Sequence, residues 1–311
     1  MEKIEHTTVA TNGINMHVAS IGTGPVILFL HGFPELWYCW RHQLLSLSSL
    51  GYRCIAPDLR GYGDSDAPAD PTQYTALHIV GDVVGLLDAL GIDQVFLVGH
   101  DWGAIIAWYV CLFRPDRIKA LVNMSVVFQP RNPLKPPVKG YREMFGDDFY
   151  ICRFQEPGEI EQDFAQADTP RLIRRFLTSR NPNPPRIPKE IGYRNLADNP
   201  DLPSWLSPED INYYASKFDQ TGFTGAVNYY RCMDRTWELT APWTGLTLST
   251  KKNRRKSMRI YMTSLRSSNQ HILSPDGNDP LSSRLLNIFH IFSDAIVVSS
   301  LKQEIKAHER S

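Results

Sequence analysis

Several features that would mark a specialised class of protein are missing from the sequence. No apolar run approaches the roughly 18 residues of a transmembrane helix, so we expect no membrane partner. The 33 basic and 33 acidic residues balance, which gives no global attraction to nucleic acid or to an anionic surface. Residues 1–6 lack the apolar stretch of a secretory signal. These absences favour a cytoplasmic protein that binds neither nucleic acid nor membrane.

Cysteine is scarce, and no two cysteines stand at the C-x-x-C spacing of a redox pair or a zinc site. The five cysteines are scattered along the chain, at positions 39, 54, 111, 152 and 232. Their odd number and wide spacing give no disulfide framework. We therefore expect buried, reduced thiols, which fits a reducing compartment.

The sequence does contain an alternation of short apolar runs with amphipathic segments. Residues 5–10 and 14–20 flank a turn signal and predict a hairpin. Four further runs predict buried strands: 26–30, which is continuously apolar as expected for a strand covered on both faces, and then 53–57, 95–98 and 118–124. Helical patterns separate them at 36–50, 75–90 and 104–113. This order predicts an α/β core over residues 1–128, with a largely parallel sheet.

The character of the sequence changes after the sixth predicted strand. Residues 129–236 are rich in proline and aromatic residues, with helical patches at 171–178 and 208–218 and no buried-strand pattern. This composition predicts a mostly helical insertion between two strands of the sheet. We expect the chain to return to the core over residues 237–246.

The segment Gly99-His100-Asp101-Trp102-Gly103 joins a buried strand to the start of a helix. Small residues on both sides of Asp101 allow a tight strand-to-helix turn that presents its side chain to a pocket. A carboxylate in that place can attack carbon and form an ester, and the helix N-terminus is expected to keep it ionised. The plainer alternative is that Asp101 only caps the helix.

A second motif argues against that alternative. His31-Gly32-Phe33-Pro34 directly follows the strand at 26–30. In enzymes whose nucleophile sits on such a strand-to-helix turn, called a nucleophile elbow, this loop supplies a backbone N–H of the oxyanion hole. The expected donors are the amides of Phe33 and Trp102. The glycine-rich run at 57–65 is expected to be a structural loop at a strand end.

With these motifs the chain resembles the soluble epoxide hydrolases, most closely those of plant type. The segments G-H-D-W-G, H-G-F-P and P-D-L-R-G-Y-G-D-S-D carry the resemblance, which runs from residue 1 to about 246. It implies an α/β-hydrolase fold with a helical lid and no metal or organic cofactor. It also implies that Asp101 attacks a small-molecule epoxide, apolar or lipid-derived, which is converted through an ester to a vicinal diol.

The resemblance further implies that two lid tyrosines hydrogen-bond the epoxide oxygen, and the matching positions are Tyr150 and Tyr230. A phenol can donate a proton to an opening alkoxide without first being ionised. The alternative is that either tyrosine only packs, since the chain has 13 of them. Tyr229 should face the other way on its helix.

Residues 247–311 depart from the family. The family has an acid and a general-base His after the lid, each in a characteristic loop, and neither loop is present. A basic, serine-rich run stands where a buried strand is expected, so we expect the sheet to be truncated at its C-terminal edge. The tail offers His271, His290 and Asp276 as candidates for the base and its acid, and His308 as a further one.

Two other functions remain open from the sequence. A haloalkane dehalogenase shares the Asp-Trp elbow, but it would need a second halide-binding residue where this chain has Phe33. The divergent tail also fits an alternative splice product that binds epoxides or lipids without turning them over.

Overall fold

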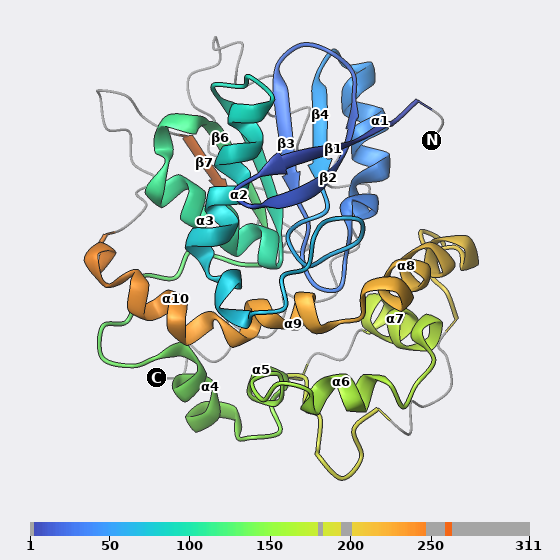
Figure 1. Cartoon of the computed structure of the whole chain (residues 1–311), viewed down its shortest axis with the longest axis vertical. Coiled ribbons are helices and arrows are strands. Elements are labelled where there is room, and N and C mark those ends of the chain that lie inside the picture. The colour runs from blue at the N-terminus through green and yellow to red at the C-terminus, as the bar shows by residue number, and fades with distance from the viewer. Residues whose placement is uncertain (1–2, 180–182, 194–200, 247–258, 263–311) are drawn as a thin grey trace, which may run out of the picture.

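The computed structural model describes residues 3–179, 183–193, 201–246 and 259–262. Its centre is a seven-stranded sheet with the strand order β1-β2-β4-β3-β5-β6-β7 (Figure 1). The strands are β1 (Glu5–Thr11), β2 (Ile14–Ile21), β3 (Val26–Leu30), β4 (Arg53–Pro57), β5 (Val95–His100), β6 (Ile118–Met124) and β7 (Arg259–Met262). β1 and β2 pair antiparallel, as do β2 and β4, and the remaining pairs are parallel.

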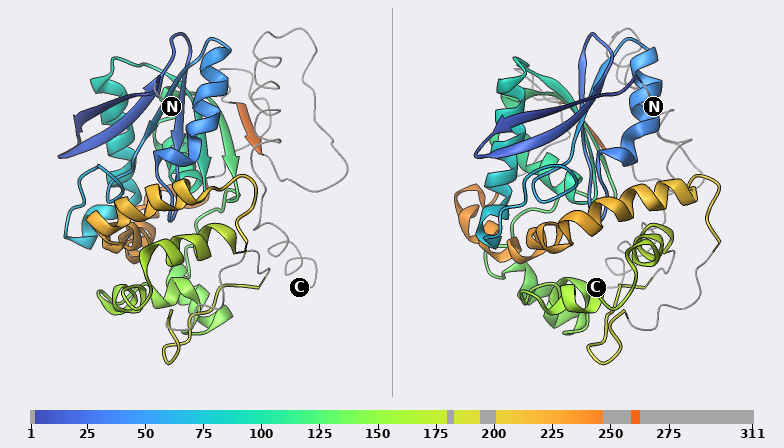
Figure 2. Two further views of the ribbon diagram at one scale, coloured as in Figure 1. Left: turned by 90° about the vertical axis from the view of Figure 1, so that its right-hand side faces the viewer. Right: turned by 45° about the vertical axis from the view of Figure 1, so that its right-hand side comes forward.

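Helices cover both faces of this sheet, as the strand patterns predict (Figure 2). Every residue of β5 from Val95 to Gly99 is buried, which explains why that run is apolar throughout. The flanking elements are η1 (Trp37–Trp40), α1 (Arg41–Ser49), η2 (Pro71–Tyr74), α2 (Ala76–Ala89), α3 (Trp102–Phe113) and η3 (Pro115–Arg117). The predicted helix at 36–50 is therefore split into a 3₁₀ turn and an α-helix.

The described residues between β6 and β7 form seven α-helices, and we call residues 137–239 the helical insertion. It forms a layer beneath the sheet in Figure 1, at the end where the parallel strands finish. Its members are α4 (Pro137–Phe145), α5 (Tyr150–Arg153), α6 (Glu159–Phe164), α7 (Thr169–Thr178), α8 (Pro208–Thr221), α9 (Thr224–Arg231) and α10 (Met233–Leu239), followed by η4 (Ala241–Trp243). None of its described residues forms a strand, as predicted.

Local signals fix several helix ends in the insertion. Ser207 and Asp210 form a reciprocal capping box at the start of α8, with Pro208 in the first turn. Asp168 caps α7 by accepting a hydrogen bond from the Arg171 amide. The predicted helical patches at 171–178 and 208–218 thus begin and end close to where the sequence places them.

The sheet extends one strand beyond the point where we expected it to stop. β7 pairs with β6 in parallel, with Ala120 opposite Arg259 and Asn123 opposite Met262. The tail was expected to contribute no sheet strand, and these four residues are the exception. The basic run at 249–257 lies outside the described residues, as do the candidate histidines of the tail.

Two further expectations concern the described chain as a whole. None of its helices is long and apolar enough to cross a membrane. All five cysteines are free, as expected, and all are buried except Cys39, which is half-buried.

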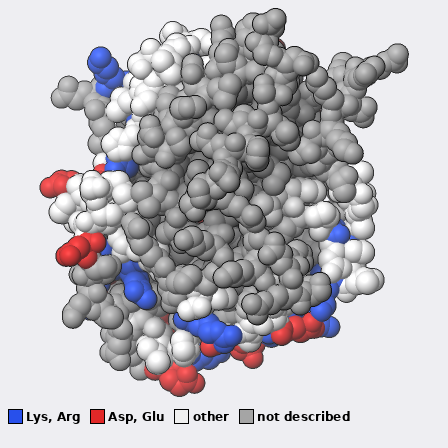
Figure 3. Space-filling model, turned by 180° about the vertical axis from the view of Figure 1, so that it is seen from behind, with Lys and Arg blue, Asp and Glu red and all other residues white. Residues whose placement is uncertain are grey.

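Seen from behind, described charged residues of both signs gather along the lower rim, over the helical insertion (Figure 3).

Candidate active site

Asp101 occupies a strained turn between β5 and α3. Its backbone has φ +52° and ψ −120°, a conformation that L-residues rarely adopt. The neighbouring glycines make this turn possible. A Cβ on Gly103 would lie 2.1 Å from the Leu30 carbonyl oxygen, and one on Gly99 would lie 2.5 Å from the Gly103 carbonyl oxygen. The predicted close approach of strand and helix is therefore confirmed.

The loop after β3 closes over that side chain. A Cβ on Gly32 would lie 2.4 Å from the Asp101 Cβ, so only glycine fits there. The amide of Phe33 donates a 2.8 Å hydrogen bond to Asp101 Oδ1, and the Trp102 amide also donates to this carboxylate. The two amides expected to form an oxyanion hole thus hold the Asp101 carboxylate itself. The peptide bond between Phe33 and Pro34 is cis.

The charge state of Asp101 reflects opposing effects. Burial raises the pKa of its carboxyl above the usual range, and the negative charge of Glu35 adds to that. The positive charge of His100 and the amide hydrogen bonds of Phe33 and Trp102 lower it, in that order of size. The helix-start amide acts in the expected direction, but burial is the larger effect, so the carboxylate is more basic than an exposed aspartate.

His100 and Glu35 form an ion pair beside Asp101. His100 Nδ1 lies 2.9 Å from Glu35 Oε2, which also accepts a 3.3 Å hydrogen bond from the Gly32 amide. Burial lowers the pKa of His100, but the Glu35 charge, its hydrogen bond and the Asp101 charge outweigh burial and raise it to about 9. The same pairing lowers the pKa of Glu35 despite burial. Glu35 was missed in the sequence, although it directly follows the H-G-F-P motif.

His31 has a structural part in the same loop. Its Nδ1 donates to the Gly32 carbonyl at 3.0 Å, and its Nε2 accepts from the Leu59 amide at 3.0 Å. Both ring nitrogens are therefore committed to backbone groups, and burial lowers the pKa of the ring. His31 is a neutral imidazole that fixes the loop carrying Phe33.

The helical insertion brings Tyr150 and Tyr230 to the elbow, from α5 and α9. The Tyr230 ring packs edge-on against Trp102, with ring centroids 5.0 Å apart, and against Phe33 at 5.6 Å. Tyr150 and Tyr230 contact each other with centroids 5.8 Å apart. Burial raises the pKa of Tyr230 well above 10, and the charges of Asp101 and Tyr150 add to this. Its hydroxyl therefore stays protonated at neutral pH.

Tyr229 is turned elsewhere, as expected from its place on the helix. Its hydroxyl donates a 2.9 Å hydrogen bond to the Arg60 carbonyl oxygen. The side chain is 1% exposed and packs beneath Trp102 and Tyr74. Tyr229 joins the insertion to the core.

The walls around the two tyrosines are aromatic. Phe33 makes edge contacts with Phe154 and Phe176, with centroids 5.7 and 5.5 Å apart. Phe154 in turn packs edge-on against Tyr230 at 4.9 Å. The elbow therefore faces an apolar surface supplied mainly by the helical insertion.

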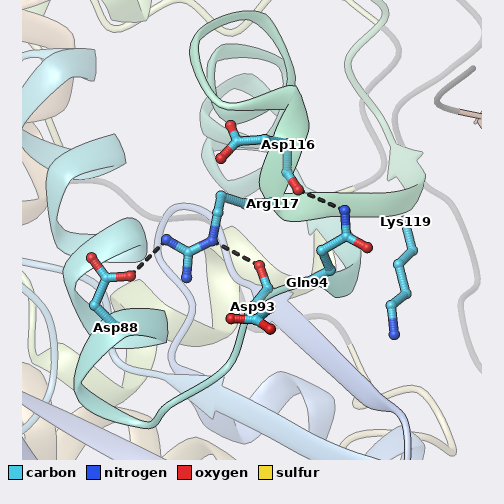
Figure 4. A pocket seen from close by; sticks show the side chains of 6 residues that line it. All are labelled: Asp88, Asp93, Gln94, Asp116, Arg117 and Lys119. Carbon is cyan, nitrogen blue, oxygen red and sulfur yellow. Dashed lines mark hydrogen bonds and ion pairs between the residues drawn. The ribbon is translucent and has the colours of Figure 1, made fainter. Parts of the chain in front are cut away.

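A charged groove in the core is not part of this site. Asp88, Asp93, Gln94, Asp116, Arg117 and Lys119 line it (Figure 4). Arg117 is tied there to Asp88 at 2.6 Å and to the Asp93 carbonyl oxygen at 2.7 Å. The groove lies where β5 and β6 begin, whereas Asp101 follows the end of β5. The groove therefore lies at the opposite end of β5 from Asp101.

Known proteins resemble the chain over most of its length. The family model described as alpha/beta hydrolase fold matches residues 25–225, which include the elbow and Tyr150. Epoxide hydrolase 3 of Siraitia grosvenorii is 71% identical over 245 residues, covering 79% of this chain and 78% of that protein. Epoxide hydrolase A of Mycobacterium tuberculosis is 40% identical over 255 residues, covering 78% of each chain.

Solved structures agree with these relatives. A crystal structure of an epoxide hydrolase from Vigna radiata superposes with a TM-score of 0.79 at 56% identity, covering 84% of this chain and 80% of that one. A potato epoxide hydrolase variant superposes with a TM-score of 0.75, also at 56% identity, covering 78% of each chain.

Proposed function

The chain belongs to the epoxide hydrolases of the α/β-hydrolase fold family, and from that premise we propose that Asp101 opens an epoxide by direct attack. The observation that carries the proposal is that main-chain amides hold the Asp101 carboxylate in one orientation. Its Oδ1 accepts from the Phe33 amide at 2.8 Å, and the Trp102 amide also donates to the carboxylate. A carboxylate oriented in this way needs no further activation to attack carbon.

Ring opening exchanges one carbon–oxygen bond for another. Asp101 Oδ2 forms an ester bond to an epoxide carbon while the bond from that carbon to the ring oxygen breaks. The oxygen leaves as an alkoxide and takes a proton from Tyr230 or Tyr150, while the other hydroxyl hydrogen-bonds to it. The raised pKa of Tyr230 supports this role, because the proton is present before the reaction and is given up only to a strong base.

Hydrolysis of the ester is a separate step with separate requirements. Water must attack the Asp101 carbonyl, and a base must take its proton. The amides of Phe33 and Trp102, which donate to the carboxylate, are suited to bind the oxyanion that develops on it. Among the described residues, neither histidine near Asp101 suits the base: His31 uses both nitrogens on backbone groups, and His100 is protonated below about pH 9. We therefore propose that the described residues perform ring opening and leave a long-lived ester.

The substrate class follows from the walls of the site. Phe33, Phe154, Phe176 and Trp102 favour an apolar or lipid-derived epoxide over a polar one. The helical insertion acts in this proposal as the lid that excludes water. Five free thiols support a reducing, cytoplasmic location. Tyr150 and Tyr230 favour an epoxide oxygen as ligand over a halide, which argues against a dehalogenase.

Intact-protein mass spectrometry tests the proposal. After exposure to an aryl-substituted oxirane, the chain should gain the mass of one substrate molecule. Asp101→Asn keeps the size and hydrogen-bonding shape of the side chain but removes the nucleophile, so it should abolish the adduct, as should Asp101→Ala. A folded Asp101→Asn variant that is alkylated at the wild-type rate would refute the assignment. A folded wild type that binds epoxide without any adduct would indicate a non-catalytic binder.

A further inference from the structure

A compact group of histidines and aspartates lies on the core, apart from the active site. In the hairpin, His6 of β1 pairs with Ala19 of β2, and His17 is two residues from Ala19 along β2. His6 and His17 are therefore diagonal neighbours on the same face of the hairpin. Their rings stack with centroids 5.2 Å apart, and His6 Nδ1 lies 3.0 Å from His17 Nε2. On its other side, His17 Nδ1 lies 2.8 Å from Asp58 Oδ2. Asp64 completes the group.

The ligand atoms of three of these residues lie close enough together to surround one metal ion. One ligand atom each from His17, Asp58 and Asp64 can be chosen so that all lie within 4.8 Å of one another. Two ligands bound to one tetrahedral Zn²⁺ at about 2.0–2.1 Å are separated by about 3.3 Å. The 2.8 Å between His17 Nδ1 and Asp58 Oδ2 is therefore within half an ångström or so of the spacing that a bridging ion needs.

The backbone around these side chains holds them in place. Asp58 is fully buried, and its Oδ1 accepts from the Trp37 amide at 2.9 Å, while Oδ2 accepts from the Asp64 amide at 3.3 Å. The loop folds so tightly that a Cβ on Gly63 would lie 2.3 Å from Asp58 Oδ2. His17 is 7% exposed, with its amide bonded to Ser65 Oγ at 2.9 Å. Two of the three ligands are thus positioned before any ion arrives.

We propose that His17, Asp58 and Asp64 form a divalent-metal site selective for Zn²⁺, with water completing the coordination. His17 Nδ1 gives its lone pair to the ion, and the proton of the ring moves to Nε2. The Nε2–H of His17 then donates a hydrogen bond to His6 Nδ1, and this bond fixes the orientation of the liganding ring. His6 can accept in this way because its own proton then resides on Nε2, so no net proton need be released by either ring. A mixed imidazole and carboxylate set suits Zn²⁺ better than Mg²⁺ or Ca²⁺, which prefer all-oxygen sites.

One basic residue competes with the ion. Lys217 of α8 places its Nζ 2.6 Å from Asp64 Oδ2 and 2.8 Å from Oδ1. In the absence of metal this ammonium neutralises Asp64, and a bound ion must displace it from at least one oxygen. The contact between Lys217 and Asp64 joins the helical insertion to the core. Binding of a metal ion at Asp64 would therefore loosen this contact.

Isothermal titration of the full chain with Zn²⁺ is the direct test, with Co²⁺ absorption as a report on nitrogen and oxygen ligation. The wild type should bind one ion per chain and melt at a higher temperature when zinc is present. Asp64→Asn should abolish both effects, because it removes an exposed ligand without entering the core. The matched control is Asp116→Asn, another exposed aspartate paired with a basic residue, which should bind as the wild type does.

Two variants separate ligation from general stabilisation. His6→Gln should weaken binding by about 10–100-fold, as the loss of an orienting partner does. Lys217→Gln should tighten zinc binding because it removes the competing ammonium, an outcome that a merely structural cluster would not give. Zinc binding that is equal in the wild type and Asp64→Asn would overturn the proposal, as would the absence of binding in the wild type and in Lys217→Gln. None of these variants alters Asp101 alkylation, so the outcome is independent of the proposed function.

Discussion

The two sides of the proposed active site are built by different means. Asp101 is fixed by the main chain, through a positive φ, two close-packed glycines and the amides of Phe33 and Trp102. Tyr150 and Tyr230 are placed instead by edge-on contacts between rings. A tight main-chain turn requires particular small residues at fixed spacing, whereas aromatic side chains can pack against one another in many arrangements. The first side should therefore be intolerant of substitution, and the second should be adjustable.

The largest expected effect is a loss of stability on substitution of Gly103, which belongs to the side of the site that the main chain fixes. In Gly103→Ala the new Cβ would meet the Leu30 carbonyl oxygen at 2.1 Å, which forces the strand and helix apart. We expect a loss of more than about 3 kcal/mol in the free energy of unfolding, or no folded chain at all. Chemical denaturation measures it. Gly140→Ala in α4 is the control, because its nearest neighbour would lie 3.5 Å away, and it should be neutral or stabilise by up to about 1 kcal/mol. Equal stabilities for the two variants would contradict the main-chain account.

The next largest effect concerns the tyrosines. Removing one donor to a developing oxyanion commonly costs about 10²–10³ in rate, so Tyr150→Phe and Tyr230→Phe should each slow ester formation to that degree. The double variant should nearly stop it. Rapid-quench mass spectrometry follows the rate. Tyr229→Phe is the matched control, since its hydroxyl donates to the Arg60 carbonyl instead and the substitution should leave alkylation intact. Wild-type alkylation in the double variant would mean that Tyr150 and Tyr230 only pack.

A smaller effect is expected from the ion pair of His100 with Glu35. The pKa of His100 is raised from 6.5 to about 9, so its contribution to stability is complete below pH 6.5 and is lost as the pH rises to about 9. The pKa of Glu35 is lowered from 4.5, so its contribution is present above that pH and is lost as the pH falls through the lowered value. Melting curves of the wild type and Glu35→Gln should therefore differ most between about pH 4.5 and 6.5 and converge towards about pH 9. A difference that does not change with pH would show that the pair is not ionised.

What the sequence could predict follows the same division. The buried strands and the elbow were predicted because apolar runs and glycine spacing are local properties. Tyr150 and Tyr230 could be selected from many tyrosines only through a family resemblance. Glu35 was missed because its partner, His100, is 65 residues away, and nothing local indicates their contact. The short strand β7 was missed because the segment around it is polar and basic, and its pairing with β6 is decided by tertiary structure.

The central claim is that the described residues carry out ring opening and leave the ester in place. The most direct test mixes the full chain with excess aryl-substituted oxirane and follows ester and diol together, by intact mass and by chromatography. The account predicts one persistent ester per chain, which digestion locates at Asp101, and at most about one equivalent of diol, because bulk water attacks a carboxylate ester slowly without a base. Diol that accumulates steadily beyond one equivalent would contradict it. His271, His290 and His308 should then each be changed to Gln to find the base.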